Sequence, residues 1–192
     1  MKNNWYYKNI NINIDFDCLR EMYFHIQKNL DDNLIRQTSR GFSIDINYVK
    51  KYKQFKSLFN IEKQFSHKHK RLRFHVNSTT SKESWKNIHI DKVDGKQAYA
   101  SIIFPLINAN NKTITSWYNL KKGKLKEASN AIGIDKSIPY EVESVYNTSF
   151  LDNVPVLCRV NQLHNVNNQT NENRIVVAWF IEQKDEHKLV YI

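Results

Sequence analysis

The sequence predicts a mainly β protein, a sandwich or barrel preceded by two helices. From about Arg71 onward, short runs of β-branched and aromatic residues alternate with polar segments typical of turns. The first 70 residues instead carry apolar side chains at helical spacing. A hydrophobic content of 41%, with 12% aromatic residues, is enough to fill a core and excludes wholesale disorder.

Two amphipathic helices are predicted in this N-terminal part. The first runs from Asp15, a candidate cap, to about Leu30. The second covers Ile46–Phe59, with Ser43 or Asp45 as its cap and lysines on its solvent side. The apolar positions that repeat every three or four residues are Phe16, Leu19, Tyr23, Ile26 and Leu30 in the first helix, and Tyr48, Tyr52, Phe55 and Phe59 in the second.

The β region contains seven strand-like runs. Between them, Lys121–Pro139 is the longest stretch without a strand pattern, and we expect a lid or a short helix there. No Gly-, Pro- or Ser-rich linker marks the change near residue 70, so we expect one domain over residues 1–192. Residues 1–70 would form a helical buttress with an N-terminal strand, and residues 71–182 the β core. The predicted strands are Arg71–Asn77, Trp85–Asp91, Ala98–Ile107, Thr113–Leu120, Val142–Phe150, Val154–Gln162 and Arg174–Glu182.

Composition narrows the class of protein further. No apolar stretch is long enough to span a membrane and no signal peptide is visible, so we expect a cytoplasmic protein. Cys18 and Cys158 are far apart in sequence and are expected to be free thiols. Lys and Arg total 29 against 19 Asp and Glu, a net charge of +10. The excess supports a nucleic-acid partner only weakly, because a Lys- and Asn-rich composition also follows from an AT-rich coding sequence.

The residues that most strongly suggest a functional site are His89 and Asp91, which could bind a metal ion together. In a strand, residues two apart point to the same face, so this imidazole and this carboxylate would converge. Such a pair suits a divalent ion, and a third ligand from another strand would leave the opposite positions open for substrates. His164 is the candidate third ligand. The alternatives are a solvent-facing polar pair and a hydrogen-bonded structural histidine.

Arg174 opens the most apolar strand of the chain, ten residues after His164. A buried arginine needs an anionic partner, and a carboxylate can accept two hydrogen bonds from it. If the strands of His164 and Arg174 form a hairpin, one small dicarboxylate could touch both the metal and the guanidinium.

The ordered set His89, Asp91, His164 and Arg174 resembles the iron(II)/2-oxoglutarate-dependent oxygenase family, in particular its small bacterial and phage hydroxylase-like members. The similarity extends to the segments Ile102-Ile103-Phe104-Pro105-Leu106 and Thr115-Ser116-Trp117-Tyr118 and covers roughly residues 71–182. The resemblance implies a double-stranded β-helix, the jelly roll also found in cupins, with helices supporting one sheet.

The resemblance also implies roles for single residues. His89, Asp91 and His164 would bind Fe(II), and Arg174 would hold the distal carboxylate of the co-substrate 2-oxoglutarate, assisted by Tyr118 or Thr115. The reaction would couple decarboxylation of 2-oxoglutarate by O₂ to hydroxylation of an unidentified primary substrate. Two positions depart from the family pattern. Val176 stands where Ser or Thr is common, and Ile103 where Asn is common.

Other functions remain open at the level of sequence. The chain could be a jelly-roll protein that has lost turnover and binds a partner through its basic surface, or a cupin-like metalloenzyme that does not use 2-oxoglutarate. The segment Ser66–Arg73 is a rival, with a His-x-His pattern and several cations, although we favour a solvated turn because neighbouring cations oppose a dication. The lysines of residues 121–126 form a second basic cluster.

Overall fold

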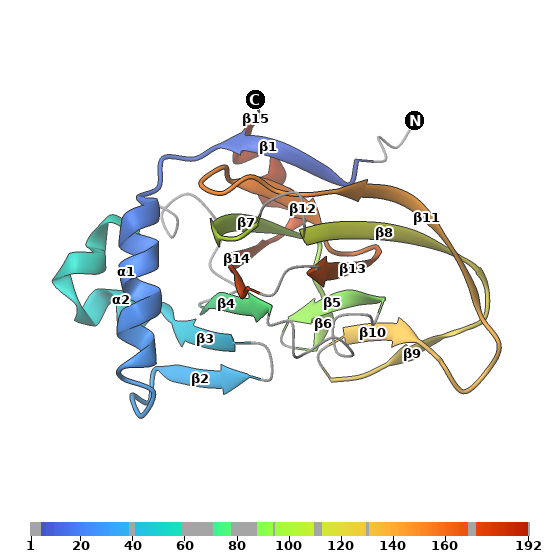
Figure 1. The fold of residues 1–192 in the computed structure, drawn as a ribbon, viewed down its shortest axis with the longest axis horizontal. Coiled ribbons are helices and arrows are strands. Elements are labelled where there is room, and N and C mark those ends of the chain that lie inside the picture. The colour runs from blue at the N-terminus through green and yellow to red at the C-terminus, as the bar shows by residue number, and fades with distance from the viewer. Residues whose placement is uncertain are drawn as a thin grey trace.

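The computed structural model describes residues 5–38, 41–58, 71–77, 88–93, 95–109, 113–129, 131–168 and 172–191. Within these ranges the protein is mainly β, as the sequence predicts, and its strands form two antiparallel sheets (Figure 1). No helix in the described ranges is both long and apolar enough to span a membrane.

The first sheet has eight strands, and helices pack on one of its faces. Its central strand β14 is buried along its whole length. This burial agrees with the continuous apolar run in the sequence, because a strand covered on both faces has no polar side to alternate with. In spatial order the strands are β15 (Val190–Tyr191), β1 (Tyr7–Asn11), β12 (Val156–Arg159), β7 (Ala100–Ile107), β14 (Arg174–Ile181), β4 (Arg71–Asn77), β3 (Gly41–Asp45) and β2 (Ile35–Thr38).

The second sheet is built around a long bent hairpin. Strand β8 continues into β9 and returns through β10 and β11, and Figure 1 shows this hairpin curving around one end of the molecule. The short helix that was one of the two expectations for Lys121–Pro139 is therefore wrong, because residues 121–122, 125–127 and 131–134 pair as strands. The order is β11 (Glu141–Thr148), β8 (Thr113–Lys122), β13 (Leu163–Asn168), β5 (His89–Val93), β10 (Ala131–Ile134) and β9 (Leu125–Glu127), with β6 (Lys96–Gln97) paired to β5.

The first predicted helix is confirmed as α1 (Phe16–Gln27). The Asp15 carboxylate caps it by accepting a hydrogen bond from the Cys18 N–H at 2.9 Å. The apolar stripe of α1 packs on the first sheet, where the rings of Phe16 and Phe104 lie 6.3 Å apart. Leu30, expected at the end of this helix, lies beyond it and is exposed.

The second helix is shorter than predicted. Asp45 caps α2 (Ile46–Lys51), but Tyr52 is extended and a 3₁₀ helix follows at Lys53–Leu58, while Phe59 lies outside the described residues. Tertiary packing accounts for the break, because it places the Tyr52 ring 4.4 Å from the ring of His25 on α1 and leaves Phe55 fully buried.

Successive side chains of β14 point alternately to the two faces of the first sheet. Ile175, Val177 and Trp179 belong to the core shared with the helices. Arg174 and Val176 point to the opposite face, toward the second sheet. The space between the sheets is therefore the place where polar side chains from both can meet.

The predicted strands mostly lie where the sequence puts them, with shifted ends. The run Arg71–Asn77 matches β4, whereas Trp85–Asp91 overlaps β5, which continues to Val93; residues 85–87 lie outside the described ranges. The strands not expected were β2, β3, β6, β9, β10, β13 and β15.

Candidate metal centre

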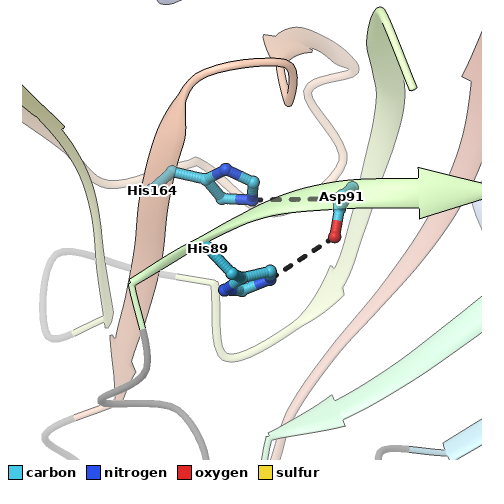
Figure 2. Close-up of side chains that lie close together, drawn as sticks. All are labelled: His89, Asp91 and His164. Carbon is cyan, nitrogen blue, oxygen red and sulfur yellow. Dashed lines mark ion pairs between the residues drawn. The ribbon is translucent and has the colours of Figure 1, made fainter. Parts of the chain in front are cut away.

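Two neighbouring strands of the second sheet bring His89, Asp91 and His164 together (Figure 2). His89 and Asp91 project from the same face of β5, and His164 on β13 pairs directly opposite His89. Nε2 of His89 lies 3.4 Å from Oδ1 of Asp91, and Nε2 of His164 lies 3.7 Å from Oδ2 of Asp91. The ring centroids of the two histidines are 4.8 Å apart. Both histidines are buried, and Asp91 is about a quarter exposed.

Hydrogen bonds with the main chain hold Asp91 and His164 in position. The Asp91 N–H donates to the carbonyl of Val160 at 3.1 Å, and the Asp91 carbonyl accepts from Ala98 at 2.9 Å. Nδ1 of His164 lies 2.9 Å from the carbonyl oxygen of Gln162. Because a carbonyl only accepts, Nδ1 carries a proton, so in the neutral form of His164 the nitrogen left to bind a metal is Nε2, which faces Asp91.

The electrostatics of the cluster keep Asp91 ionised. Burial by itself raises the pKa of the Asp91 carboxyl, but the hydrogen bond with His89 and the charges of His164, His89 and His75 outweigh burial and lower it below its usual range. An ionised carboxylate beside two imidazoles is a donor set that suits Fe(II) and other divalent ions with open coordination positions.

The spacing of the donor atoms is close to what an ion needs. One ligand atom from each of His89, Asp91 and His164 lies within 4.8 Å of the others. Ligands bound at about 2.1 Å on one face of an ion are about 3 Å apart. The observed separations are somewhat longer than this, and the described cluster could bind a metal ion.

The cluster opens into a pocket between the two sheets, here called the inter-sheet pocket. Its empty space, including its opening to solvent, is about 620 Å³. Most of its walls are apolar. The described residues that line it are His75, His89, Asp91, Ser101, Ile103, Thr115, Trp117, Phe150, Cys158, Arg159, Val160, His164, Val166, Arg174, Val176, Ala178 and Phe180.

Arg174 enters this pocket from the first sheet, and its side chain is 3% exposed. No described carboxylate forms an ion pair with it, and its buried Nε has no hydrogen-bond partner there. Burial lowers its pKa from 12.5 to about 10, so the guanidinium still carries its charge at neutral pH. The ring of Phe150, 5.5 Å from the guanidinium carbon, offers partial compensation.

The hairpin expected between the strands of His164 and Arg174 is wrong. His164 belongs to β13 in the second sheet and Arg174 to β14 in the first. The two side chains nevertheless line one pocket, because they reach it from opposite sheets. This arrangement brings together all four residues of the predicted set.

Of the two residues expected to assist Arg174, the structure brings Thr115 into the pocket and leaves Tyr118 outside. Thr115 is buried and its hydroxyl has no partner among the described residues. Tyr118 projects from the other face of β8, and its hydroxyl donates to Oδ1 of Asn165 at 3.1 Å. Val176 and Ile103, the two departures from the family pattern, both line the pocket.

Sequence reasoning missed several residues of the pocket. His75 was not among the predicted site residues, yet it lines the pocket from β4. The alternation along this strand could have predicted its position: Leu72 and Phe74 are apolar and buried, so His75 lies on the opposite face of the same strand. Trp117 and Phe150 carried no comparable signal, since buried aromatic residues are common in any core.

The rival basic segments do not contribute to the pocket as described. In the stretch Ser66–Arg73, residues 66–70 and with them the His-x-His pattern lie outside the described ranges. The lysines of residues 121–126 lie on the exposed part of the bent hairpin, where Lys121 pairs with Glu143 at 2.7 Å.

Comparisons of the chain with models of protein families, with curated proteins and with solved structures find no match. The class of protein can therefore be stated only from the fold and the site. The described chain is mainly β, with two antiparallel sheets and a buried His-Asp-His cluster that could bind a metal ion. Anything more specific has to be argued from the geometry of the pocket.

Proposed function

We propose that the protein is an Fe(II)/2-oxoglutarate-dependent oxygenase that hydroxylates a C–H bond of a second substrate, and that its two sheets form a double-stranded β-helix. The observation that carries the proposal is the buried guanidinium of Arg174, which has no ion-pair partner among the described residues and shares one pocket with His89, Asp91 and His164. A metal bound by His89, Asp91 and His164, together with the buried guanidinium of Arg174, would form a binding site for a molecule with a carboxylate at each end.

The residues present suit both groups. His89, Asp91 and His164 would hold the iron and leave one side of it free. Iron bound there would supply the redox chemistry that couples decarboxylation of 2-oxoglutarate to substrate oxidation. The hydrogen bond from His164 to Gln162 and the main-chain contacts of Asp91 hold the ligand atoms before the metal binds.

Arg174 would bind the distal carboxylate of 2-oxoglutarate with charge-assisted hydrogen bonds. The Thr115 hydroxyl lies in the same pocket, has no partner in the described part of the chain, and could donate a further one. Val176 lacks the hydroxyl that similar proteins have two residues after the arginine. The hydroxyl of Thr115, on the opposite sheet, would take over its hydrogen bond to the co-substrate.

The walls of the pocket exclude water on the side away from its opening. Trp117 is fully buried, and its ring lies 5.9 Å from that of Tyr6. Tyr6 on the N-terminal side of β1 stacks on Tyr146 of β11 at 5.4 Å, so aromatic rings cover this edge, where the two sheets meet. Exclusion of water keeps the charges of the site strong and protects reactive species.

The test is anaerobic binding of Fe(II) and 2-oxoglutarate to the full chain. We expect the weak visible charge-transfer band that 2-oxoglutarate produces when it chelates iron, and consumption of 2-oxoglutarate once O₂ is admitted. Asp91→Ala and His164→Ala should abolish the band by removing a ligand. Arg174→Met should lower the affinity for 2-oxoglutarate while leaving metal binding intact.

The matched controls are His187→Ala and Arg36→Met, which change exposed residues of the same types. Both should behave as the wild type. Wild-type protein that binds Fe(II) but not 2-oxoglutarate would contradict the proposal and favour a metalloenzyme without this co-substrate. Protein that binds neither would favour a binding protein without turnover.

A further inference from the structure

Aromatic side chains continue the row of metal-cluster histidines toward the surface of the protein. Strands β11, β8, β13 and β5 lie side by side in this order (Figure 1), and residues directly opposite each other on neighbouring strands share a face of the sheet. Trp117 on β8 pairs with His164 on one side and with Tyr146 on the other. Because His164 also pairs with His89, one row of side chains runs from the metal cluster through Trp117 to Tyr146.

The aromatic rings of this row are in contact with one another. The ring centroids of Trp117 and Tyr146 lie 5.9 Å apart, and the ring of Tyr6 lies 5.9 Å from that of Trp117. Tyr6 and Tyr146 stack with their centroids 5.4 Å apart and 9° between the ring planes. These separations are typical of packed aromatic pairs. The two stacked rings, here called the Tyr6–Tyr146 pair, therefore both contact Trp117.

The two ends of the row lie in different environments. Trp117 is fully buried and lines the inter-sheet pocket beside His164. Its indole N–H donates to the carbonyl of Arg159 at 2.8 Å, and a carbonyl is too weak a base to take this proton. Tyr146 is 37% exposed, so its side chain contacts water. Trp117 can therefore lose an electron while it keeps its proton, whereas Tyr146 can pass a proton to solvent.

Cys158 is a further oxidisable side chain of the pocket and lies on the opposite sheet, on β12. Burial raises the pKa of its thiol well above the usual range, so the thiol is protonated and uncharged at neutral pH. The thiolate is the reactive form of cysteine. A buried neutral thiol is therefore a poorer electron donor than the aromatic row, which can release a proton to water at its outer end.

We infer that Trp117 and the Tyr6–Tyr146 pair carry electrons from the protein surface to the metal cluster, and that they discharge iron that has been oxidised with no primary substrate in place. This inference rests on the proposed function, in which O₂ and 2-oxoglutarate oxidise the iron. Electron transfer slows steeply with distance, so several short steps between rings in contact are faster than one long step. Without such a path, the oxidised iron would attack the side chains of its own pocket.

Each transfer moves one electron. The oxidised iron takes an electron from the indole of Trp117, Trp117 takes one from a phenol of the Tyr6–Tyr146 pair, and this phenol releases its proton to solvent. A one-electron reductant in solution, of the ascorbate class, then returns an electron and a proton to the phenoxyl group. Two such transfers, with two protons from solvent, bring the iron back to Fe(II) and release the unused oxygen atom as water.

The test follows the protein in the absence of any primary substrate. The full chain is loaded anaerobically with Fe(II) and 2-oxoglutarate, mixed with O₂ and freeze-quenched for EPR spectroscopy. We expect the signal of a tyrosyl radical, which should narrow when the protein is made with ring-deuterated tyrosine. Ascorbate should make the signal decay faster, because it reduces the phenoxyl group at the surface.

Two variants interrupt the path at different points. Tyr6→Phe combined with Tyr146→Phe keeps both rings and removes only the hydroxyls, so the melting temperature and the affinity for 2-oxoglutarate should stay close to those of the wild type. We expect this double variant to lose the tyrosyl signal, to become inactive after fewer turnovers, and to gain oxygen adducts on Trp117 and Cys158 in peptide mass spectrometry. Trp117→Phe, with Fe(II) binding measured on the same sample, should also lose the tyrosyl signal.

The matched control is Tyr118→Phe combined with Tyr140→Phe, because Tyr118 projects from the other face of β8 and Tyr140 is an exposed residue outside the row. This control should keep the full signal. The inference would be overturned by wild-type protein without a tyrosyl radical, or by a full signal in either interrupted variant. Oxidation of the wild type that is confined to Cys158 would also overturn it, because the thiol would then discharge the iron.

The two proposals fail in different ways. Wild-type protein that binds Fe(II) but not 2-oxoglutarate would overturn the oxygenase proposal alone. Hydrogen peroxide added to the Fe(II) protein supplies oxidising equivalents at the metal without 2-oxoglutarate, so the tyrosyl signal and its loss in the double variant would still decide whether the aromatic row carries electrons. The Zn(II) protein treated with peroxide should give no signal, because zinc has no redox chemistry.

Discussion

Replacing Arg174 by methionine should make the ligand-free protein more stable. The guanidinium is 3% exposed and has no ion-pair partner among the described residues. Burial lowers its pKa from 12.5 to about 10. A tenfold change in protonation corresponds to about 1.4 kcal/mol, so burial disfavours the charged form by about 3 kcal/mol.

The contact with Phe150 offsets part of this penalty. A desolvated cation over an aromatic ring gains about 2 kcal/mol at most. Methionine has a similar length and no charge, so it should fill the same space. We therefore expect Arg174→Met to raise the free energy of unfolding by about 1 to 3 kcal/mol. For a chain of this size that corresponds to a melting temperature about 2 to 12 °C higher.

The same substitution should weaken 2-oxoglutarate binding strongly. Two hydrogen bonds to a charged group contribute about 1.5 to 3 kcal/mol each, so affinity should fall by about a hundredfold or more. Urea unfolding without ligands measures the first effect, and calorimetry on the Zn(II) protein measures the second, with Arg36→Met as the control. Destabilisation of the ligand-free Arg174→Met protein would refute the reasoning, because it would mean that the guanidinium is already satisfied.

Three further predictions concern other parts of the molecule. Thr115→Val should leave the unfolding free energy equal or slightly higher, because it removes an unpartnered hydroxyl, and should weaken 2-oxoglutarate binding by about tenfold; normal affinity would exclude Thr115 from the site. Gly41→Ala should lower the unfolding free energy by about 2 kcal/mol or more, since φ is +128° and a Cβ would clash with the carbonyl oxygen of Phe74; an unchanged urea midpoint would contradict this. The pKa of Asp32 is lowered in the folded protein, first by its hydrogen bond from Lys51, so its stabilisation is present above about pH 4 and is lost as the pH falls through the lowered pKa. The difference in stability between wild type and Asp32→Asn should therefore shrink in acid, and a constant difference would count against the pair.

The features that the sequence predicted correctly are local ones. The cap at Asp15 and the apolar stripe that follows it predicted α1, because capping and helical periodicity act within a few residues. The strand β4 was predicted with both its ends. The convergence of His89 and Asp91 followed from the alternation of side chains along one strand, which holds in any sheet.

The errors concern interactions between distant segments. Lys121–Pro139 has no strand pattern of its own, because its residues are mostly exposed and pair within a bent hairpin that the rest of the sheet supports. The second helix was predicted too long because helical spacing continues past Tyr52, where packing against His25 ends the helix.

The sequence by itself determined the fold class, the first helix and the shared face of His89 and Asp91, because short-range sterics and periodicity are sufficient for these features. Only the tertiary structure decided that His164 lies opposite His89 and that Arg174 reaches the same pocket from the other sheet. It also decided that Thr115 and His75 face the pocket while Tyr118 does not. The physical reason is that strand pairing and sheet stacking depend on how the two apolar faces fit together, and no local pattern specifies which distant segments will meet.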